Sequence, residues 1–244
     1  MSPVTPSPWT EVGWRADRFF PNLNIMDTPE VLERIARTGI VPVITIEQVQ
    51  HALPLADALL AAGIPIIEIT FRTAAAADVI GTLVRERPQL TVGAGTVLTR
   101  ENVRAASQAG AQFALAPGLN PHIVKLAAEF ELPFVPGIAT ASEVELALSL
   151  GCRMLKFFPA ELLGGVEMIK ALSAPYGHTH VRFIPTGGVN PANLESYLAC
   201  KHVAAVGGTW LAKNEDLAGN KWGEIRRRCE VAVETERRTR RPGE

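Results

Sequence analysis

The residue with the clearest chemical potential in this sequence is Lys156. It is the only one of the six lysines that lies inside an apolar run, at 154–158, while the others fall in stretches of helical period or in polar sequence. An apolar surround removes hydration from an ammonium group and favours the neutral amine. A neutral amine is the nucleophile that condenses with a ketone. On this pattern alone, a lysine that reaches solvent or pairs with Glu68 or Glu161 is an equally good interpretation.

Glu68 is the second anomaly, because its carboxyl group stands within the apolar run 66–70. A buried carboxyl group needs a partner or a proton. Strand alternation places Glu68, Thr70 and Arg72 on one face. Side chains from alternate strands of a barrel share interior layers, so Glu68 and Lys156 can meet. Since a buried lysine–glutamate pair rarely stabilises a fold more than apolar packing does, the sequence favours a functional pair over a structural one.

Two glycine turns carry the third signal. They are Thr186-Gly187-Gly188 and Gly207-Gly208-Thr209, each at the end of an apolar run. In barrel enzymes the loops after the seventh and eighth strands commonly bind phosphate through backbone N–H groups and a helix N-terminus. Glycine permits close approach to the backbone, and threonine hydroxyls donate hydrogen bonds. Together the two turns predict a phosphate site, although each alone is a weak signal.

The chain that must position these groups alternates short apolar runs with stretches of helical period. The runs are rich in β-branched and aromatic residues, as is typical of strands buried on both faces. Eight strands are predicted, at 40–45, 65–70, 91–95, 112–116, 133–137, 153–157, 181–185 and 203–207. Helices are predicted at 47–62, 74–86, 100–109, 121–131, 142–150, 166–173, 191–200 and 223 to about 236.

Local signals support these boundaries and decide the architecture. Asn120, Asn190 and Ser142 stand where helices should begin, and glycines stand where helices should end, at Gly63, Gly110 and Gly151. An open doubly wound sheet also fits the alternation, but no Gly-x-Gly-x-x-Gly turn follows the first strand and the repeat count is eight. We therefore predict an α/β fold, a single (β/α)₈ TIM barrel.

The two ends of the chain lie outside this repeat. Residues 28–38 predict an extra N-terminal helix that covers the bottom of the barrel, so the domains are an N-terminal extension at 1–27 and a barrel at 28–244. The extension is either a flexible arm or an arm that packs its aromatic residues on its own or a neighbouring subunit; these are Trp9, Trp14, Phe19 and Phe20. The arginine-rich C-terminal end is predicted to be a solvated tail.

Composition excludes several classes of function. A net charge of −1 and a pI of about 6.5 argue against nucleic-acid or membrane-surface partners. No apolar run reaches the roughly 18 to 20 residues of a membrane span, and the first 27 residues have no signal-peptide core, so we expect a cytoplasmic protein. The three cysteines are expected to be reduced. His178 and His180 are expected at the surface, and no metal site is predicted.

Several stretches, taken in order, closely resemble the 2-keto-3-deoxy-6-phosphogluconate (KDPG) and 4-hydroxy-2-oxoglutarate (KHG) aldolases. The resemblance runs from about residue 28 to residue 212. The most specific stretch is Lys156-Phe157-Phe158-Pro159-Ala160-Glu161. The others are at 41–44, 68–73, 92–98, 117–119, 136–138, 185–188 and 207–210.

The resemblance implies a trimeric (β/α)₈ class I aldolase that needs neither metal nor cofactor. It would cleave KDPG to pyruvate and glyceraldehyde 3-phosphate, as in the Entner–Doudoroff pathway, and also 4-hydroxy-2-oxoglutarate to pyruvate and glyoxylate. The implied roles are Schiff-base lysine for Lys156, general acid/base for Glu68, carboxylate binding for Arg72 and Thr96, pocket lining for Pro117 and Phe158, and phosphate binding for Thr186, Gly187, Gly188 and Thr209. The family commonly has serine where Thr209 stands, so this residue adds a methyl group to the phosphate site.

Three alternatives remain open. A related 2-keto-3-deoxy acid aldolase would use the same imine with a phosphogalactonate-derived or unphosphorylated substrate. A metal-independent phosphosugar isomerase or epimerase would share the phosphate loops and form no imine. A non-catalytic barrel that binds a phosphosugar would need neither Lys156 nor Glu68.

Overall fold

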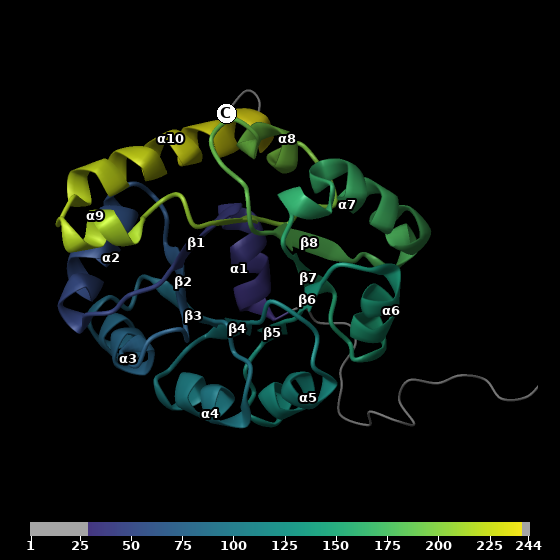
Figure 1. Cartoon of the computed structure of the whole chain (residues 1–244), viewed down its shortest axis with the longest axis horizontal. Coiled ribbons are helices and arrows are strands. Elements are labelled where there is room, and N and C mark those ends of the chain that lie inside the picture. The colour runs from purple at the N-terminus through teal and green to yellow at the C-terminus, as the bar shows by residue number, and fades with distance from the viewer. Residues whose placement is uncertain (1–28, 241–244) are drawn as a thin grey trace, which may run out of the picture.

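The structure is a computed structural model that describes residues 29–240. The described strands are all parallel to their neighbours, and helices surround them in a ring (Figure 1). The strands are β1 (Ile40–Ile44), β2 (Ile66–Thr70), β3 (Thr91–Gly95), β4 (Phe113–Leu115), β5 (Phe134–Val135), β6 (Gly137–Ile138), β7 (Met154–Phe157), β8 (Arg182–Pro185) and β9 (Val206–Gly208). The predicted α/β barrel is confirmed.

Two short breaks interrupt the ring of strands without opening it. Strand order runs β5-β4-β3-β2-β1-β9 in one sheet and β6-β7-β8 in the other. The predicted strand 133–137 is split into β5 and β6 at Pro136, which has no N–H to donate to a ladder. Single bridges, Phe183 to Val203 and Thr186 to Gly207, join β8 to β9. The carboxyl ends of the strands therefore meet around one opening of the barrel.

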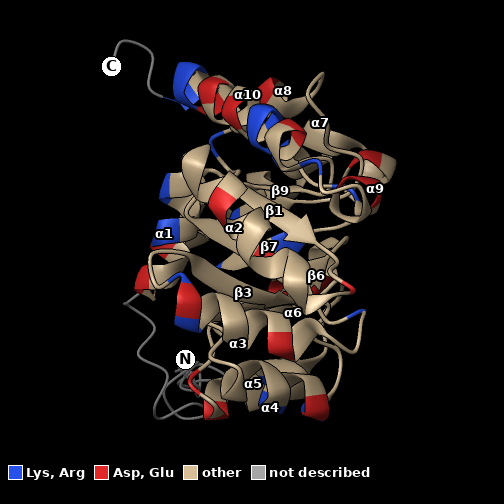
Figure 2. Ribbon diagram, turned by 90° about the vertical axis from the view of Figure 1, so that its left-hand side faces the viewer, with Lys and Arg blue, Asp and Glu red and all other residues tan. Residues whose placement is uncertain are grey.

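The outer helices follow the strands in the predicted alternation. They are α2 (Ala52–Ala61), α3 (Ala76–Glu86), α4 (Arg100–Gln108), α5 (Pro121–Glu129), α6 (Ala141–Ser149), α7 (Gly165–Ser173), α8 (Leu194–Leu198), α9 (Asn214–Ala218) and α10 (Trp222–Arg240), with short 3₁₀ turns at η2 (Val49–His51), η3 (Glu161–Leu163) and η4 (Ala174–Thr179). Charged side chains gather on these helices, while the strands are almost bare of charge (Figure 2). No described helix is both long and apolar enough to cross a membrane.

Helix α1 (Glu30–Thr38) is the extra helix expected before the first strand, and it lies across the ring in Figure 1. It leads directly into the start of β1, so it covers the amino ends of the strands. Leu32 and Ile35 are its buried residues. The expected extension at 1–27 lies outside the described residues. One end of the barrel is therefore covered by α1, and the opposite end holds the loops that follow the strands.

Helix ends agree with the local signals better than helix starts do. Gly63, Gly110 and Gly151 all have positive φ just after helices, as expected. Asn120 caps α5 by accepting a hydrogen bond from His122 N. The other two starts were wrong, because Thr140 and not Ser142 caps α6, and because Asn190 is followed by a turn and α8 begins only at Leu194.

The prediction of a solvated arginine-rich tail was wrong. Helix α10 continues to Arg240, whose guanidinium is partly buried. This group donates hydrogen bonds to the backbone carbonyls of Ala204, at 2.8 Å, and Val203, at 2.9 Å, and at 3.3 Å to that of Ala36. A guanidinium has five N–H donors, so it can satisfy several carbonyls at once. The end of the chain thus fastens α10 to α1 and to the segment before β9.

Candidate active site

The centre of the candidate site is an ion pair inside the barrel. Lys156 on β7 donates a hydrogen bond to Glu68 on β2, with Nζ 3.1 Å from Oε1 and 3.5 Å from Oε2. Lys156 is 5% exposed and Glu68 is 1% exposed. Within residues 29–240, neither side chain makes another hydrogen bond. The two residues that the sequence singled out do share one interior layer, and Glu161 is not the partner of Lys156.

Glycine makes the room that Glu68 needs. The parallel register places Glu68 opposite Gly93 of β3, and Gly95 follows two residues further along that strand. A Cβ atom on Gly95 would lie 2.1 Å from Glu68 Oε1, a distance that no real contact has. The glycine at 95 is therefore required for the carboxylate to lie where it can reach Lys156.

A second glycine shapes the wall beside Lys156. In the parallel register Gly137 of β6 is the partner of Lys156, with Ile184 of β8 on the other side. A Cβ atom on Gly137 would lie 2.2 Å from the carbonyl oxygen of Pro117. Pro117 follows β4 and is half-buried. The structure therefore places this predicted pocket residue against the strand next to the lysine.

The predicted carboxylate-binding residues lie at the ends of β2 and β3. Phe71 N donates to the carbonyl oxygen of Gly95 at 2.7 Å, which ties the two strand ends together. Thr96 has a φ of 56°, a left-handed conformation that is costly for a threonine. Arg72 is exposed, and its guanidinium has no hydrogen-bond or ion-pair partner in the described part of the chain. In the described part of the chain these residues make no hydrogen bond to the side chains of the ion pair, and Arg72 is free to take an anionic ligand.

The turn at Gly187 and Gly188 has its carbonyls occupied and its amides available. Both glycines have positive φ, 95° and 85°. The carbonyl of Gly187 accepts a hydrogen bond from Glu161 N, and that of Gly188 accepts from the side chains of Asn190 and Asn193. Neither glycine N–H has an acceptor among residues 29–240. Consecutive unpaired amides of this kind form an anion-binding concavity.

The other predicted phosphate residues and one pocket residue surround this turn. The ring of Phe158 lies 3.3 Å from the position of a Cβ atom on Gly187. Thr186 bridges to Gly207, and its buried hydroxyl has no partner in the described residues. Thr209 follows β9 and is exposed. The structure therefore brings these residues to neighbouring strand ends, although the Thr209 side chain makes no hydrogen bond to the others in the described part of the chain.

The sequence interpretation missed the residues that support the glycine turn. Glu161 lies under Gly188, since a Cβ atom on that glycine would be 2.5 Å from Glu161 Cβ. The Glu161 carboxylate accepts a hydrogen bond from the hydroxyl of Tyr197, a fully buried side chain on α8. Burial and the neighbouring Glu161 raise the pKa of Tyr197. The sequence gives no sign of which residue a buried tyrosine in a predicted helix will contact. Glu161, by contrast, ends the specific run 156–161 and could have been considered for this role.

The described residues contain no group of three or more His, Cys, Asp or Glu side chains that could hold a metal ion. The expected surface position of His178 and His180 is confirmed, because both are exposed. Cys200 and Cys229 are buried free thiols, and Cys152 is a half-buried one.

Fold and site together define a (β/α)₈ barrel enzyme whose ionisable groups meet at the carboxyl ends of the strands. The family model for KDPG and KHG aldolase matches residues 31–228, and this chain belongs to that family of lyases.

Curated relatives and solved structures agree with the family model. The KHG/KDPG aldolase of Escherichia coli (strain K12) is 43% identical over 203 residues, which cover 83% of this chain and 94% of the relative. The 2-dehydro-3-deoxy-phosphogluconate aldolase of Treponema pallidum is 45% identical over 195 residues, covering 80% and 92%. The crystal structure of KDPG aldolase from Legionella pneumophila, with pyruvate captured as a covalent carbinolamine, has a TM-score of 0.79 at 37% identity, covering 84% of this chain and 98% of that one.

Proposed function

We propose that this protein is a class I aldolase that cleaves KDPG to pyruvate and glyceraldehyde 3-phosphate through an imine on Lys156. The observation that carries the proposal is the isolated, buried pair of Lys156 and Glu68. Transfer of the ammonium proton to the carboxylate gives a neutral amine next to a carboxylic acid. This is the combination that attack on a ketone requires.

Imine formation uses both members of the pair. The Lys156 nitrogen adds to the C2 ketone and gives a carbinolamine, whose hydroxyl must be protonated to leave as water. Glu68, with an oxygen 3.1 Å from Nζ, is placed to supply that proton. The product is a protonated imine, which draws electrons away from the substrate carbon chain.

Cleavage then needs a base at the C4 hydroxyl. Glu68 accepts this proton, the C3–C4 bond breaks, and its electron pair moves through C3 and C2 to the imine nitrogen. Glyceraldehyde 3-phosphate leaves as the aldehyde, and an enamine of pyruvate remains on Lys156. Protonation at C3 and addition of water release pyruvate and restore the amine.

The strand-end residues suit the two anionic ends of this substrate. Arg72 has no partner in the described part of the chain and presents a guanidinium that binds carboxylate by two parallel hydrogen bonds, with Thr96 beside it. The free amides of Gly187 and Gly188 bind the phosphate together with Thr186 and Thr209. Pro117 and Phe158 form the walls between the two ends.

The same site accommodates 4-hydroxy-2-oxoglutarate, because its cleavage to pyruvate and glyoxylate uses the same imine. The homotrimer, the cytoplasmic location, the place in the Entner–Doudoroff pathway and the independence of metals and cofactors are part of the proposal and rest on the family resemblance.

Trapping with borohydride tests the proposal. The protein is incubated with pyruvate and sodium borohydride, and the modified peptide is mapped by mass spectrometry. We expect a stable adduct on Lys156 and none on Lys156→Arg, which keeps a positive charge beside Glu68 but cannot form the imine. If the wild-type protein shows no adduct under conditions that trap a known class I aldolase, the imine is excluded and a phosphosugar isomerase or epimerase becomes the better assignment.

A further inference from the structure

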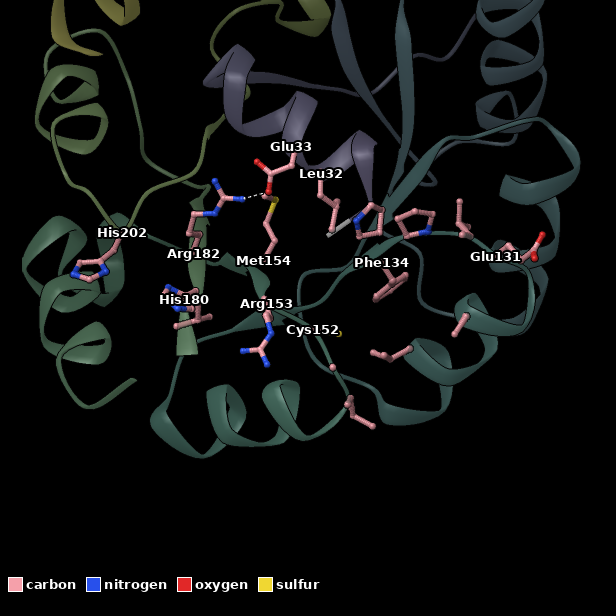
Figure 3. A pocket seen from close by; sticks show the side chains of 18 of the residues that line it. Leu32, Glu33, Glu131, Phe134, Cys152, Arg153, Met154, His180, Arg182 and His202 are labelled. Carbon is pink, nitrogen blue, oxygen red and sulfur yellow. Dashed lines mark hydrogen bonds and ion pairs between the residues drawn. The ribbon is translucent and has the colours of Figure 1, made fainter. Parts of the chain in front are cut away.

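A large cavity lies at the opposite end of the barrel from Lys156. Its volume is about 850 Å³, and it is enclosed by α1, by the amino ends of β5, β7 and β8, and by α5 (Figure 3). Apolar side chains form most of its wall, among them Leu32, Leu132, Phe134 and Met154. A cavity of this size and composition in the wall of a folded domain can hold several apolar side chains.

Three of the charged side chains in the wall of this cavity are already engaged. Glu33 and Arg182 form an ion pair at 2.6 Å, visible as the dashed line in Figure 3. The guanidinium of Arg153 donates to the carbonyl oxygen of Thr179. A small-molecule site depends on a few converging polar groups that remain available to the ligand. Because most of its wall is apolar and three of its charged side chains are engaged, the cavity suits an apolar occupant better than a polar metabolite.

The chain itself supplies apolar groups at the mouth of the cavity. Pro29, the first described residue, lines the cavity, so the 28 residues before it emerge there. This segment contains four aromatic residues, two of them adjacent, at Trp9, Trp14, Phe19 and Phe20. The family match begins only at residue 31, so this segment lies outside it.

We propose that the cavity is the docking site of the chain's own N-terminal segment, with Phe19 and Phe20 as the side chains that enter it. Pro29 lies nine positions after Phe20, and an extended chain of that length spans roughly 30 Å. This is enough to cross the mouth of the cavity in either direction. Covalent attachment keeps the segment at a high effective concentration, on the order of millimolar, so it outcompetes a free partner of equal affinity.

Thiol labelling reads the docking directly, because Cys152 lines the cavity. In the full-length protein we measure the rate of modification of Cys152 by N-ethylmaleimide, with the buried Cys200 and Cys229 as internal references. The double variant Phe19→Ala, Phe20→Ala should react at least about 10-fold faster at Cys152 and melt roughly 4 to 8 °C lower. Equal rates within twofold would overturn the proposal.

A matched control separates docking from general loss of apolar side chains. Val231→Ala removes a residue on α10 that is 50% exposed, and it should change neither the Cys152 rate nor the melting temperature. Trapping of pyruvate on Lys156 should be unchanged in both variants, because that site is at the other end of the barrel. Failure of the docking proposal and failure of the proposed activity are therefore distinguishable.

Photocrosslinking identifies the occupant in a chain that keeps its aromatic character. With p-benzoylphenylalanine in place of Phe20, we expect a crosslink to the peptides that contain Phe134 or Met154, at the mass of a single chain on a denaturing gel. A crosslink at the mass of two chains would assign the cavity to the segment of a second copy. That result, or crosslinks that map elsewhere, would overturn the proposal.

Discussion

Two ion pairs with buried carboxylates lie in different regions of this molecule, and their surroundings differ. The side chains of Lys156 and Glu68 meet inside the barrel, where neither has another hydrogen-bond partner within residues 29–240. Arg228 and Asp216 join α10 to α9 outside the barrel, where the Arg228 side chain is 21% exposed and that of Asp216 is 5% exposed. In both pairs an opposite charge compensates the buried carboxylate. In the described part of the chain, only the side chains of the outer pair, Arg228 and Asp216, also make hydrogen bonds to other groups.

Each member of the outer pair has a second partner. Arg228 also donates to the carbonyl oxygen of Trp210 at 2.9 Å, and Asp216 also accepts from the backbone N–H of Lys213 at 3.1 Å. Burial raises the pKa of Asp216, but the hydrogen bonds from Arg228 and Lys213 together lower it by more. The pKa of Asp216 therefore lies below its usual value. Both members of this pair therefore stay ionised at neutral pH. Their bonds connect α9 and the loop after Thr209 to α10.

The inner pair, Lys156 and Glu68, leaves hydrogen-bonding positions unoccupied by the other described residues. An ammonium group has three donors and a carboxylate has about four acceptor positions, and this pair uses few of them. Burying such an under-bonded pair costs free energy that apolar packing would not. The two pairs therefore differ in one respect that the proposed function requires: the inner pair keeps hydrogen-bonding positions that a substrate can occupy.

Among the variants that can still form the imine, Glu68→Gln should lose the most turnover. Glutamine keeps the volume and polarity of the side chain, but it cannot exchange protons. We expect kcat/KM for KDPG to fall by about 10² to 10⁴-fold, while pyruvate is still trapped on Lys156 by borohydride.

Glu33→Gln is the control for this prediction. It removes the carboxylate that pairs with Arg182 at the opposite end of the barrel, and it should leave kcat/KM unchanged. If Glu68→Gln is as active as the wild-type protein, the inner pair is structural, as the outer pair is.

Changing Gly188 to Ala should weaken binding of the phosphorylated substrate. The new Cβ would lie 2.5 Å from Glu161 Cβ at a residue with a φ of 85°, so the turn must move and its amides lose their common direction. We expect KM for KDPG to rise by about 10 to 100-fold, with little effect on pyruvate trapping, which involves no phosphate.

Gly63→Ala provides the same backbone strain away from the site. Gly63 has a φ of 82°, and its nearest neighbour is 3.9 Å from a Cβ position. This variant should lower the melting temperature and leave KM unchanged. A KM that rises equally in both variants would show that the effect comes from lost stability.

Much of the barrel and the centre of the site could be predicted because their signals are local. Apolar runs of strand length, positive-φ glycines such as Gly110 after helices, and the spacing of the glycine turns all arise from residues adjacent in the chain. Strand alternation then sufficed to place Glu68 opposite Lys156. The roles of these residues stay predictions until the measurements above are made.

The contacts that could not be predicted join residues far apart in the chain. Tyr197 reaches Glu161 across 36 positions, and Arg240 reaches Ala36 across 204. An arginine-rich end has the composition of a solvated tail, and only the packing of α10 on α8 and α2 brings Arg240 to the backbone carbonyls that it binds. Side-chain pairing of this kind depends on how elements pack, which local sequence does not encode.

The smallest effect on turnover, and a purely structural one, is expected for Asp216→Asn. Loss of the charge leaves Arg228 without its ionic partner and should lower the free energy of unfolding by about 2 to 3 kcal/mol near pH 7. The melting temperature should fall by roughly 5 to 10 °C, measured by calorimetry, with pyruvate trapping retained.

The pH dependence of that difference tests the cause. Because folding lowers the pKa of Asp216 below its ordinary value of 3.8, the carboxylate contributes stability above that ordinary value, and the contribution is lost as pH falls through the folded pKa. The gap in melting temperature between wild type and Asp216→Asn should therefore be constant from neutral pH down to about pH 5 and shrink below about pH 4. Glu215→Gln, at an exposed acid on the same helix, should show no gap at any pH. A gap that persists unchanged at low pH would mean that Asp216 acts through packing, and the contrast between a permanently charged outer pair and a proton-exchanging inner pair would lose its basis.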